Sequence, residues 1–226
     1  MNYLLKKCLA MGTTAALAVG LAFGPVHQAE AAAFPLLKVG QKNNSAQVKD
    51  VQSRLKQLGL YHKQVTGTYD AYTRDAVIQF QKKRHLKWID GIVGPETTGT
   101  LKKDTYSQQE INLLARAVYS ESRGEPFEGQ VAVAAVVLNR VDHKDFPNTV
   151  KGVIYEPGAF TAVKDGQINL KPNATAYQAV AKAIRGSDPT GGAVYYYNPQ
   201  TASSRWMKNQ AKQKRTLKIG QHVFLK

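Results

Sequence analysis

Two carboxylates four residues apart, Glu121 and Glu125, are the side chains of this chain best suited to acid–base chemistry. A carboxylic acid can give its proton to a glycosidic oxygen and, once ionised, take a proton back. The first step needs a group that is still protonated near neutral pH, which burial favours. The elements that surround Glu121 therefore decide whether it can act in this way.

A helix beginning at Ser107 is the first of these elements. Ser107 and Glu110 form the S-x-x-E pattern of a capping box. Apolar residues then recur at helical spacing, at Ile111, Leu114, Ala115 and Val118. Glu121 falls at the edge of this stripe in the last turn, where the helix dipole and apolar neighbours favour the protonated carboxyl group. The alternative is a surface carboxylate that merely ends a helix beside Arg123.

The end of this helix and the start of the next are also marked. Gly124 can supply a left-handed cap, and Pro126 forbids simple continuation. Residues Gly129 to Arg140 are mostly Val and Ala, with hardly a polar face before Asn139. This composition predicts a buried helix.

The run A-V-Y-S-E-S-R-G-E-P-F-E-G-Q at residues 117–130, with the Val/Ala segment after it, resembles the hallmark of the spore cortex-lytic enzymes. These are germination-specific peptidoglycan hydrolases of endospore formers. The resemblance implies a lysozyme-like catalytic domain with an acidic residue at the end of its first helix. It places the catalytic role on Glu121, with Glu125 as the nearby alternative or supporting group.

Two later segments resemble parts of the same family. The turn at residues 156–158 leads into an F-T pair that the resemblance puts near substrate, although core and exposed positions would explain it equally. Residues 193–199 read A-V-Y-Y-Y-N-P, and in a strand Tyr195 and Tyr197 would share one face with Tyr196 on the other. The substrate-binding residues that we predict are Phe160, Thr161, Tyr195, Tyr197, Asn198 and Trp206.

The catalytic groups available narrow the reaction. Residues 107–226 hold only two histidines, His143 and His222, outside any metal-binding pattern, and no G-x-S-x-G pattern is present. The only cysteine, Cys8, lies in the expected leader, which excludes a thiol nucleophile and disulfides from the mature chain. We therefore expect no metal and no cofactor.

A glycosidase that hydrolyses its substrate normally uses two carboxylates, whereas a lytic transglycosylase can work with one. The family resemblance favours a lytic transglycosylase that cleaves cortex peptidoglycan rich in muramic lactam and leaves 1,6-anhydromuramic products. The alternatives are an N-acetylmuramoyl-L-alanine amidase and a non-catalytic wall-binding protein. The resemblance also suggests a companion germination protein in the inner spore membrane as partner.

An internal repeat organises the region before Ser107. Residues 67–77 and 91–101 align 24 apart, matching Gly67 with Gly91 and Thr73 with Thr97. Each unit reads as a turn followed by the start of a helix, and a further helical stripe precedes the first unit. The repeat predicts a compact bundle of three helices over residues 38–104.

This region resembles the type 1 peptidoglycan-binding domain through V-Q-S-R-L-K-Q-L-G-L-Y, T-G-T-Y-D-A-Y-T and D-G-I-V-G-P-E-T. The resemblance implies a wall-binding module without chemistry of its own. Most of its apolar residues are expected in the core. The ligand contacts that we predict are Tyr69, Tyr72, Trp88 and Asp90.

The organisation that follows has three parts: a signal peptide at 1–33, a peptidoglycan-binding domain at 34–106 and a lysozyme-like catalytic domain at 107–226. The leader rests on Lys6, Lys7, an apolar run and the A-x-A site at residues 29–31; a membrane anchor is the alternative. The fold class expected is mainly α (α+β). We expect an exported protein of the spore cortex, at the outer face of the inner spore membrane.

The net charge of +15 points to an anionic partner. Residues 34–106 hold 13 basic and 6 acidic side chains, and residues 107–226 hold 16 and 9, so each part carries +7. A charge spread so evenly does not indicate a nucleic-acid groove. Peptidoglycan is the partner that we expect.

Overall fold

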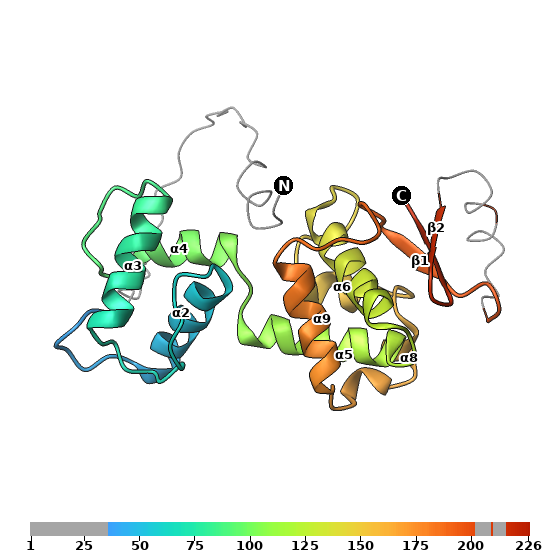
Figure 1. Cartoon of the computed structure of the whole chain (residues 1–226), viewed down its shortest axis with the longest axis horizontal. Helices are drawn as coiled ribbons and strands as arrows, with labels where there is room; N and C mark the ends of the chain where they lie inside the picture. Colours follow the sequence, from blue (N-terminus) through green and yellow to red (C-terminus); the bar gives the residue numbers. More distant parts are fainter. Residues whose placement is uncertain (1–35, 202–208, 210–215) are drawn as a thin grey trace, which may run out of the picture. The chain divides into compact units, whose positions relative to one another are not determined.

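The computed structural model describes residues 36–201, 209 and 216–226 (Figure 1). The described residues form two compact units that divide between Thr105 and Tyr106, one residue before the expected boundary. The expected leader, residues 1–33, lies outside the described part. Within the described part, no helix is both long and apolar enough to cross a bilayer.

In its described part, residues 36–105, the first unit is a bundle of three helices, α2 (Ser45–Gln57), α3 (Ala71–Lys83) and α4 (Pro95–Asp104). Side-chain caps start the first two, since Asn44 accepts from the Gln47 amide and Asp70 from the Thr73 amide, both through side-chain oxygens. Proline at the first position of α4 suits a helix start. The core between the helices is made by fully buried side chains such as Val48, Leu55, Val77, Phe80 and Leu101.

The repeat appears in the structure as two equivalent buried amides, Gln52 on α2 and Gln81 on α3. Each side-chain oxygen accepts from the amide of a glycine with positive φ, Gly67 or Gly91. Each side-chain nitrogen donates to the carbonyl of the next residue and to a threonine hydroxyl. The partners are 24 residues apart in every case: Thr66 and Asp90, Gly67 and Gly91, Thr68 and Ile92, Thr73 and Thr97.

The second unit is built around α6 (Phe127–Asp142), which packs against α5 (Gln108–Ser122) and α9 (Ala174–Ile184). Its residues 131–138 are all fully buried, which explains why this stretch has no polar face. The capping box is present, because Ser107 and Glu110 bond reciprocally. The described residues of this unit also form three short helices: α7 (Val150–Ile154), α8 (Thr161–Lys164) and the 3-10 helix η1 (Gln167–Asn169).

A small antiparallel sheet joins this helical unit. Its strands are β1 (Tyr195–Tyr197), β2 (Thr216–Ile219) and β3 (His222–Leu225), in the order β1–β3–β2. Tyr196 pairs with Phe224 in this register. The chain is mainly helical with little strand, as the sequence predicts.

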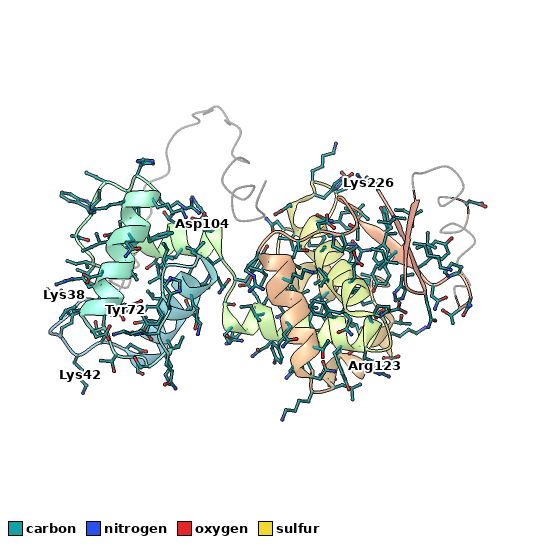
Figure 2. All side chains as sticks on the ribbon, viewed as in Figure 1. Lys38, Lys42, Tyr72, Asp104, Arg123 and Lys226 are labelled. Carbon is teal, nitrogen blue, oxygen red and sulfur yellow. The ribbon has the colours of Figure 1, made fainter. Side chains whose placement is uncertain are left out.

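The expected glycine cap of α5 is wrong. Helix α5 ends with Arg123 in right-handed conformation as its C-cap, and Gly124 is not among the glycines with positive φ. The chain turns instead through the Glu125 amide, which donates to the Ser122 carbonyl over 2.9 Å. Arg123, labelled in Figure 2, is exposed at this end of the helix. Glu121 remains in the last turn, where the sequence places it.

Candidate active site

The Glu121 carboxylate is held by two donors that come from distant segments. Its Oε1 accepts from the backbone amide of Ala162, in α8, over 3.0 Å. Its Oε2 accepts from the hydroxyl of Tyr196, in β1, over 3.1 Å. The side chain is partly buried and lies in the wall of a cavity. Since both oxygens have fixed partners, the carboxyl group has one defined orientation toward the cavity.

The Tyr196 hydroxyl is set up to remain protonated. Burial of the phenol raises the pKa of Tyr196 well above its usual value, and the negative charge of Glu121 adds to this. Arg140 acts in the opposite sense. A hydroxyl can donate to a carboxylate or accept from a carboxylic acid. Tyr196 can therefore bond to Glu121 in either protonation state of the carboxyl group.

Arg140, near the end of α6, supports this wall of the site. It is buried, and its Nε donates to the Val194 carbonyl over 2.7 Å, just before β1. Its guanidinium lies 5.4 Å from the centroid of the Phe160 ring and 5.7 Å from that of Tyr195. Cation–π contacts of this kind stabilise packing by about 0.5–2 kcal/mol each. They fix the strand that carries Tyr196.

The neighbouring Asn139 holds the loop that leads into β1. Its amide nitrogen donates to the Asp188 carboxylate over 3.1 Å and to the Ala193 carbonyl over 2.9 Å. The Asp188 carboxylate also accepts from the amides of Thr190 and Gly192. The polar residues near the C-terminal end of α6 thus position strand β1.

The cavity beside Glu121 has a volume of about 670 Å³, which is large enough for more than one sugar ring. It lies wholly within the second unit. Its walls come from the end of α5, the segment around α8 and η1, β1 and the start of β3. The lining residues are Ser120, Glu121, Ser122, Gly124, Glu125, Gly158, Ala159, Thr161, Ala162, Asp165, Gln167, Tyr196, Tyr197, Asn198, Thr201 and His222.

Comparison with known proteins assigns both units. Residues 44–101 match the family model described as putative peptidoglycan binding domain, and residues 124–225 match the one described as cell wall hydrolase. A spore cortex-lytic enzyme of Bacillus cereus is 45% identical over 217 residues, covering 79% of this chain and 82% of that protein. This chain belongs to the spore cortex-lytic enzyme family.

Other members of the family agree with this assignment. A spore cortex-lytic enzyme of Bacillus subtilis is 57% identical over 119 residues, covering 53% of this chain and 38% of that protein. The crystal structure of the catalytic domain of the Bacillus cereus SleB protein is 60% identical, with a TM-score of 0.50. The alignment covers 54% of this chain and 94% of the chain in that structure. This chain is thus a peptidoglycan-degrading cell wall hydrolase whose peptidoglycan-binding domain precedes its catalytic domain.

The cavity brings together five of the residues predicted for the catalytic domain: Glu121, Glu125, Thr161, Tyr197 and Asn198. Phe160 is only 3% exposed and lies against Arg140, so it supports the site from within the core. Tyr195 packs against Phe146, with ring centroids 5.7 Å apart, and does not line the cavity. Trp206 lies outside the described residues.

Tyr196 and His222 line the cavity but are absent from the residues that the sequence predicts for the site. Alternation along β1 already separates Tyr196 from its two neighbours. Which face meets the helices depends on pairing with β3, more than 25 residues later in the chain. A three-residue strand carries no local signal for that choice.

The four predicted contact residues of the peptidoglycan-binding unit differ in exposure. Tyr69 is only 4% exposed and donates from its hydroxyl to the Gly91 carbonyl over 2.8 Å, so its role is structural. Tyr72, labelled in Figure 2, is partly buried against Tyr61, with Lys63 4.3 Å from its ring centroid. Trp88 is 62% exposed, and Asp90 is exposed with Oδ1 supporting the turn. Both line a shallow cavity of about 190 Å³.

Groups of three or more His, Cys, Asp or Glu side chains close enough to share a metal ion are absent from the described ranges 36–201, 209 and 216–226. The two histidines of the catalytic unit lie in separate places. His143 makes a T-shaped contact with Phe146, whereas His222 contacts Tyr196 at the cavity.

Proposed function

We propose that this enzyme is a lytic transglycosylase that cleaves the MurNAc–GlcNAc bond of spore cortex peptidoglycan during germination, with Glu121 acting first as acid and then as base. The proposal is carried by one observation. The Glu121 carboxylate stands in the wall of the cavity, oriented by the Ala162 amide and the Tyr196 hydroxyl. The relative from Bacillus anthracis whose catalytic domain is 61% identical is described as a germination-specific lytic transglycosylase, which supports the same reaction here.

The reaction consumes no water, because the muramic 6-hydroxyl replaces the leaving sugar at C1. The Glu121 carboxylic acid protonates the glycosidic oxygen, the C1–O bond of the muramic residue breaks, and the GlcNAc leaves with a free 4-hydroxyl. The carboxylate then takes the proton of the muramic 6-hydroxyl, whose oxygen closes onto C1. The product is a 1,6-anhydromuramic end, and Glu121 is again protonated. The Ala162 amide keeps Oε1 an acceptor, so in this scheme Oε2 carries the mobile proton.

The placement of Glu125, the second carboxylate of the predicted pair, favours a reaction in which Glu121 acts alone. The Glu125 side chain is only 7% exposed, and its Oε2 accepts from the Gln221 amide over 2.9 Å. A nucleophile or general base must face the anomeric carbon or a water beside it. The Glu125 carboxylate is buried with both oxygens facing the turn at Gln221 and His222, so it is poorly placed for that task.

Mass spectrometry of the muropeptides released from spore sacculi tests the proposal. Anhydromuramic ends are the expected product. Reducing muramic ends would make the enzyme a glycan hydrolase, and free stem peptides would make it an amidase. Each outcome identifies one reaction, because the three reactions break or close different bonds.

A hydrolase is the second candidate, because another carboxylate, Asp165, lines the same cavity. Asp165 is exposed, and its two oxygens accept from the amide and the side chain of Gln167. These hydrogen bonds lower the pKa of Asp165, and the bond from the Gln167 backbone amide has the larger effect. Asp165 is therefore ionised at neutral pH. An inverting hydrolase requires a second, ionised carboxylate in the same site as the acid, and Asp165 is such a carboxylate in this cavity.

Replacing Asp165 by Asn separates the two candidates. In a lytic transglycosylase we expect less than a threefold loss of kcat on soluble glycan fragments, since Asp165 takes no part in proton transfer. In a hydrolase, loss of the base would cost about 10²–10⁴-fold. A loss of that size, together with reducing ends, would replace our proposal by the hydrolase.

We also propose that Trp88 is a contact of the peptidoglycan-binding unit with wall glycan. Its ring is largely exposed beside the carboxylates of Asp90 and Glu96, which suits stacking on a sugar and hydrogen bonding to its hydroxyls. In the full chain, Trp88→Ala is expected to weaken sacculus binding by roughly 2–10-fold, if a ring–sugar contact contributes as much as an aromatic pair, about 0.5–1.5 kcal/mol. Co-sedimentation with sacculi measures this.

The matched control is Tyr69→Phe. It removes the buried hydroxyl bond to Gly91, so it should lower the melting temperature of the unit and leave binding of the folded protein unchanged. Weaker binding by Tyr69→Phe than by Trp88→Ala would contradict the assignment of Trp88.

We propose that the enzyme is exported and works at the outer face of the inner spore membrane, beside a companion germination protein there. The leader expected at residues 1–33 and the cortex-lytic names of its relatives support this. Immunodetection in fractionated spores tests the location. Co-purification from the membrane fraction tests the partner.

A further inference from the structure

The Glu125 carboxylate binds the C-terminal hairpin of strands β2 and β3. Glu125 lies between α5 and α6, and its side chain is 7% exposed. Its Oε2 accepts from the amide of Gln221, in the hairpin turn, over 2.9 Å. Its Oε1 lies 3.8 Å from Nδ1 of His222, the first residue of β3. Both oxygens therefore face one turn, 96 residues later in the chain.

The hairpin turn closes directly on this carboxylate through Gly220. Gly220 has a φ of +59°, which glycine adopts without steric cost. A Cβ atom at this position would lie 2.0 Å from Oε2 of Glu125 and 3.0 Å from Cδ of Pro126. Only a residue without a side chain allows this approach.

The hairpin in turn fixes the Tyr196 phenol. Strand β3 pairs with β1 so that Tyr196 faces Phe224, with ring centroids 5.8 Å apart. The His222 ring makes a T-shaped contact with Tyr196 at 5.1 Å. The hydroxyl at the end of this phenol is the group that bonds to Glu121. A continuous set of contacts thus runs from Glu125 through the hairpin to the Glu121 carboxylate.

We propose that Glu125 is a positioning residue, which binds the β2–β3 hairpin at Gln221 and His222 and so holds the Tyr196 hydroxyl against Glu121. This role rests on the proposed function of Glu121. It gives Glu125 no share in proton transfer. The requirement is an acceptor oxygen at the position of Oε2, and the negative charge is secondary.

The imidazole of His222 provides a direct readout of this contact. Its side chain is 9% exposed, and Nδ1 makes no hydrogen bond within the described residues. Burial lowers the pKa of His222, while the charge of Glu125, and then that of Glu121, opposes this. The other titratable group facing the ring is the Tyr196 phenol, and the Phe224 ring also contacts it. Removing the charge of Glu125 should therefore lower the pKa of His222 further.

The test compares two substitutions of Glu125 in the full chain, on soluble glycan fragments. Glu125→Gln keeps a carbonyl oxygen for the Gln221 amide, and we expect at least a third of the wild-type kcat. Glu125→Ala loses the acceptor, and we expect a loss of roughly 10–100-fold in kcat with KM within threefold, the size of effect that misplaced groups produce. NMR should show His222 titrating at lower pH in Glu125→Gln, whereas Glu128→Gln, an exposed neighbour, should leave it unchanged.

Gly220→Ala reaches the same contact from the other side, and it keeps the test decisive if Glu125→Ala does not fold. The new Cβ displaces the carboxylate, so kcat should again fall about 10–100-fold. The proposal is overturned if Glu125→Gln is as inactive as Glu121→Gln, because Glu125 would then be a catalytic carboxylate. Wild-type kcat in Glu125→Ala or Gly220→Ala overturns it as well.

Failure of the positioning role and failure of the proposed reaction give different results. Reducing ends from the wild-type enzyme would refute the transglycosylase, yet the kcat ratios of the Glu125 variants would still measure positioning. An active Glu121→Gln enzyme would remove the group that the hairpin is proposed to serve.

Discussion

Glu121→Gln is expected to reduce kcat by about 10²–10⁴-fold while the protein folds normally and binds sacculi as before. The Gln side chain is nearly isosteric, and its carbonyl oxygen can keep the bond from the Ala162 amide. Its NH₂ group can donate to the Tyr196 hydroxyl, which can also act as an acceptor. The amide can neither protonate the glycosidic oxygen nor take a proton from the 6-hydroxyl, so both steps fail together.

The measurement is kcat on soluble glycan fragments, with melting temperature and sacculus co-sedimentation as checks on folding and binding. Glu128→Gln is the matched control, because it makes the same change of charge at an exposed site in the first turn of α6. It should remain within twofold of wild type. Near wild-type turnover in Glu121→Gln would show that Glu121 is not the catalytic carboxylate.

Tyr196→Phe should cause a loss of roughly 10–100-fold in kcat, the same range as Glu125→Ala. The change removes one hydroxyl and leaves the ring packed against His222 and Phe224. A hydrogen bond to a charged group contributes about 1.5–3 kcal/mol, and every 1.4 kcal/mol is a tenfold change in rate. Without this bond, Oε2 of Glu121 loses the partner that orients it toward the substrate.

Tyr195→Phe is the comparison that gives the result its meaning. Tyr195 is the adjacent tyrosine and packs against Phe146 away from the cavity, so its variant should lose less than threefold in kcat. Single-turnover kinetics on soluble fragments measure both variants. The opposite order of effects would place Tyr195 at the substrate and remove Tyr196 from the site.

Local patterns predict the elements of this enzyme well. The capping box at Ser107 and Glu110 starts α5 where the sequence places it. The apolar spacing that follows predicts correctly that Glu121 lies in the last turn of this helix, at the edge of its buried face. The glycine–threonine repeat predicts both turns of the first unit. These features succeed because each depends on residues within about one turn of helix or one tight turn.

The long-range contacts to Glu121 and Glu125 cannot be predicted from local sequence patterns. Ala162, Tyr196 and Gln221 lie 41, 75 and 96 residues beyond the glutamates that they contact. Two of these three contacts come from backbone amides, whose donors no side-chain motif can mark. The third depends on the register of a three-residue strand. Long-range pairing, rather than residue type, decides them.

The paired amides of Gln52 and Gln81 make the first unit a scaffold for two exchangeable loops. Each amide is fully buried and bonds mainly to backbone groups and a threonine, so it demands little of the loop residues ahead of each turn. His62 and Lys63 ahead of one turn, and Lys87 and Trp88 ahead of the other, are exposed. Libraries randomised at these four positions can be selected on other polysaccharides while the helices and their glutamines stay fixed, which redirects the enzyme to a new surface without redesigning its core.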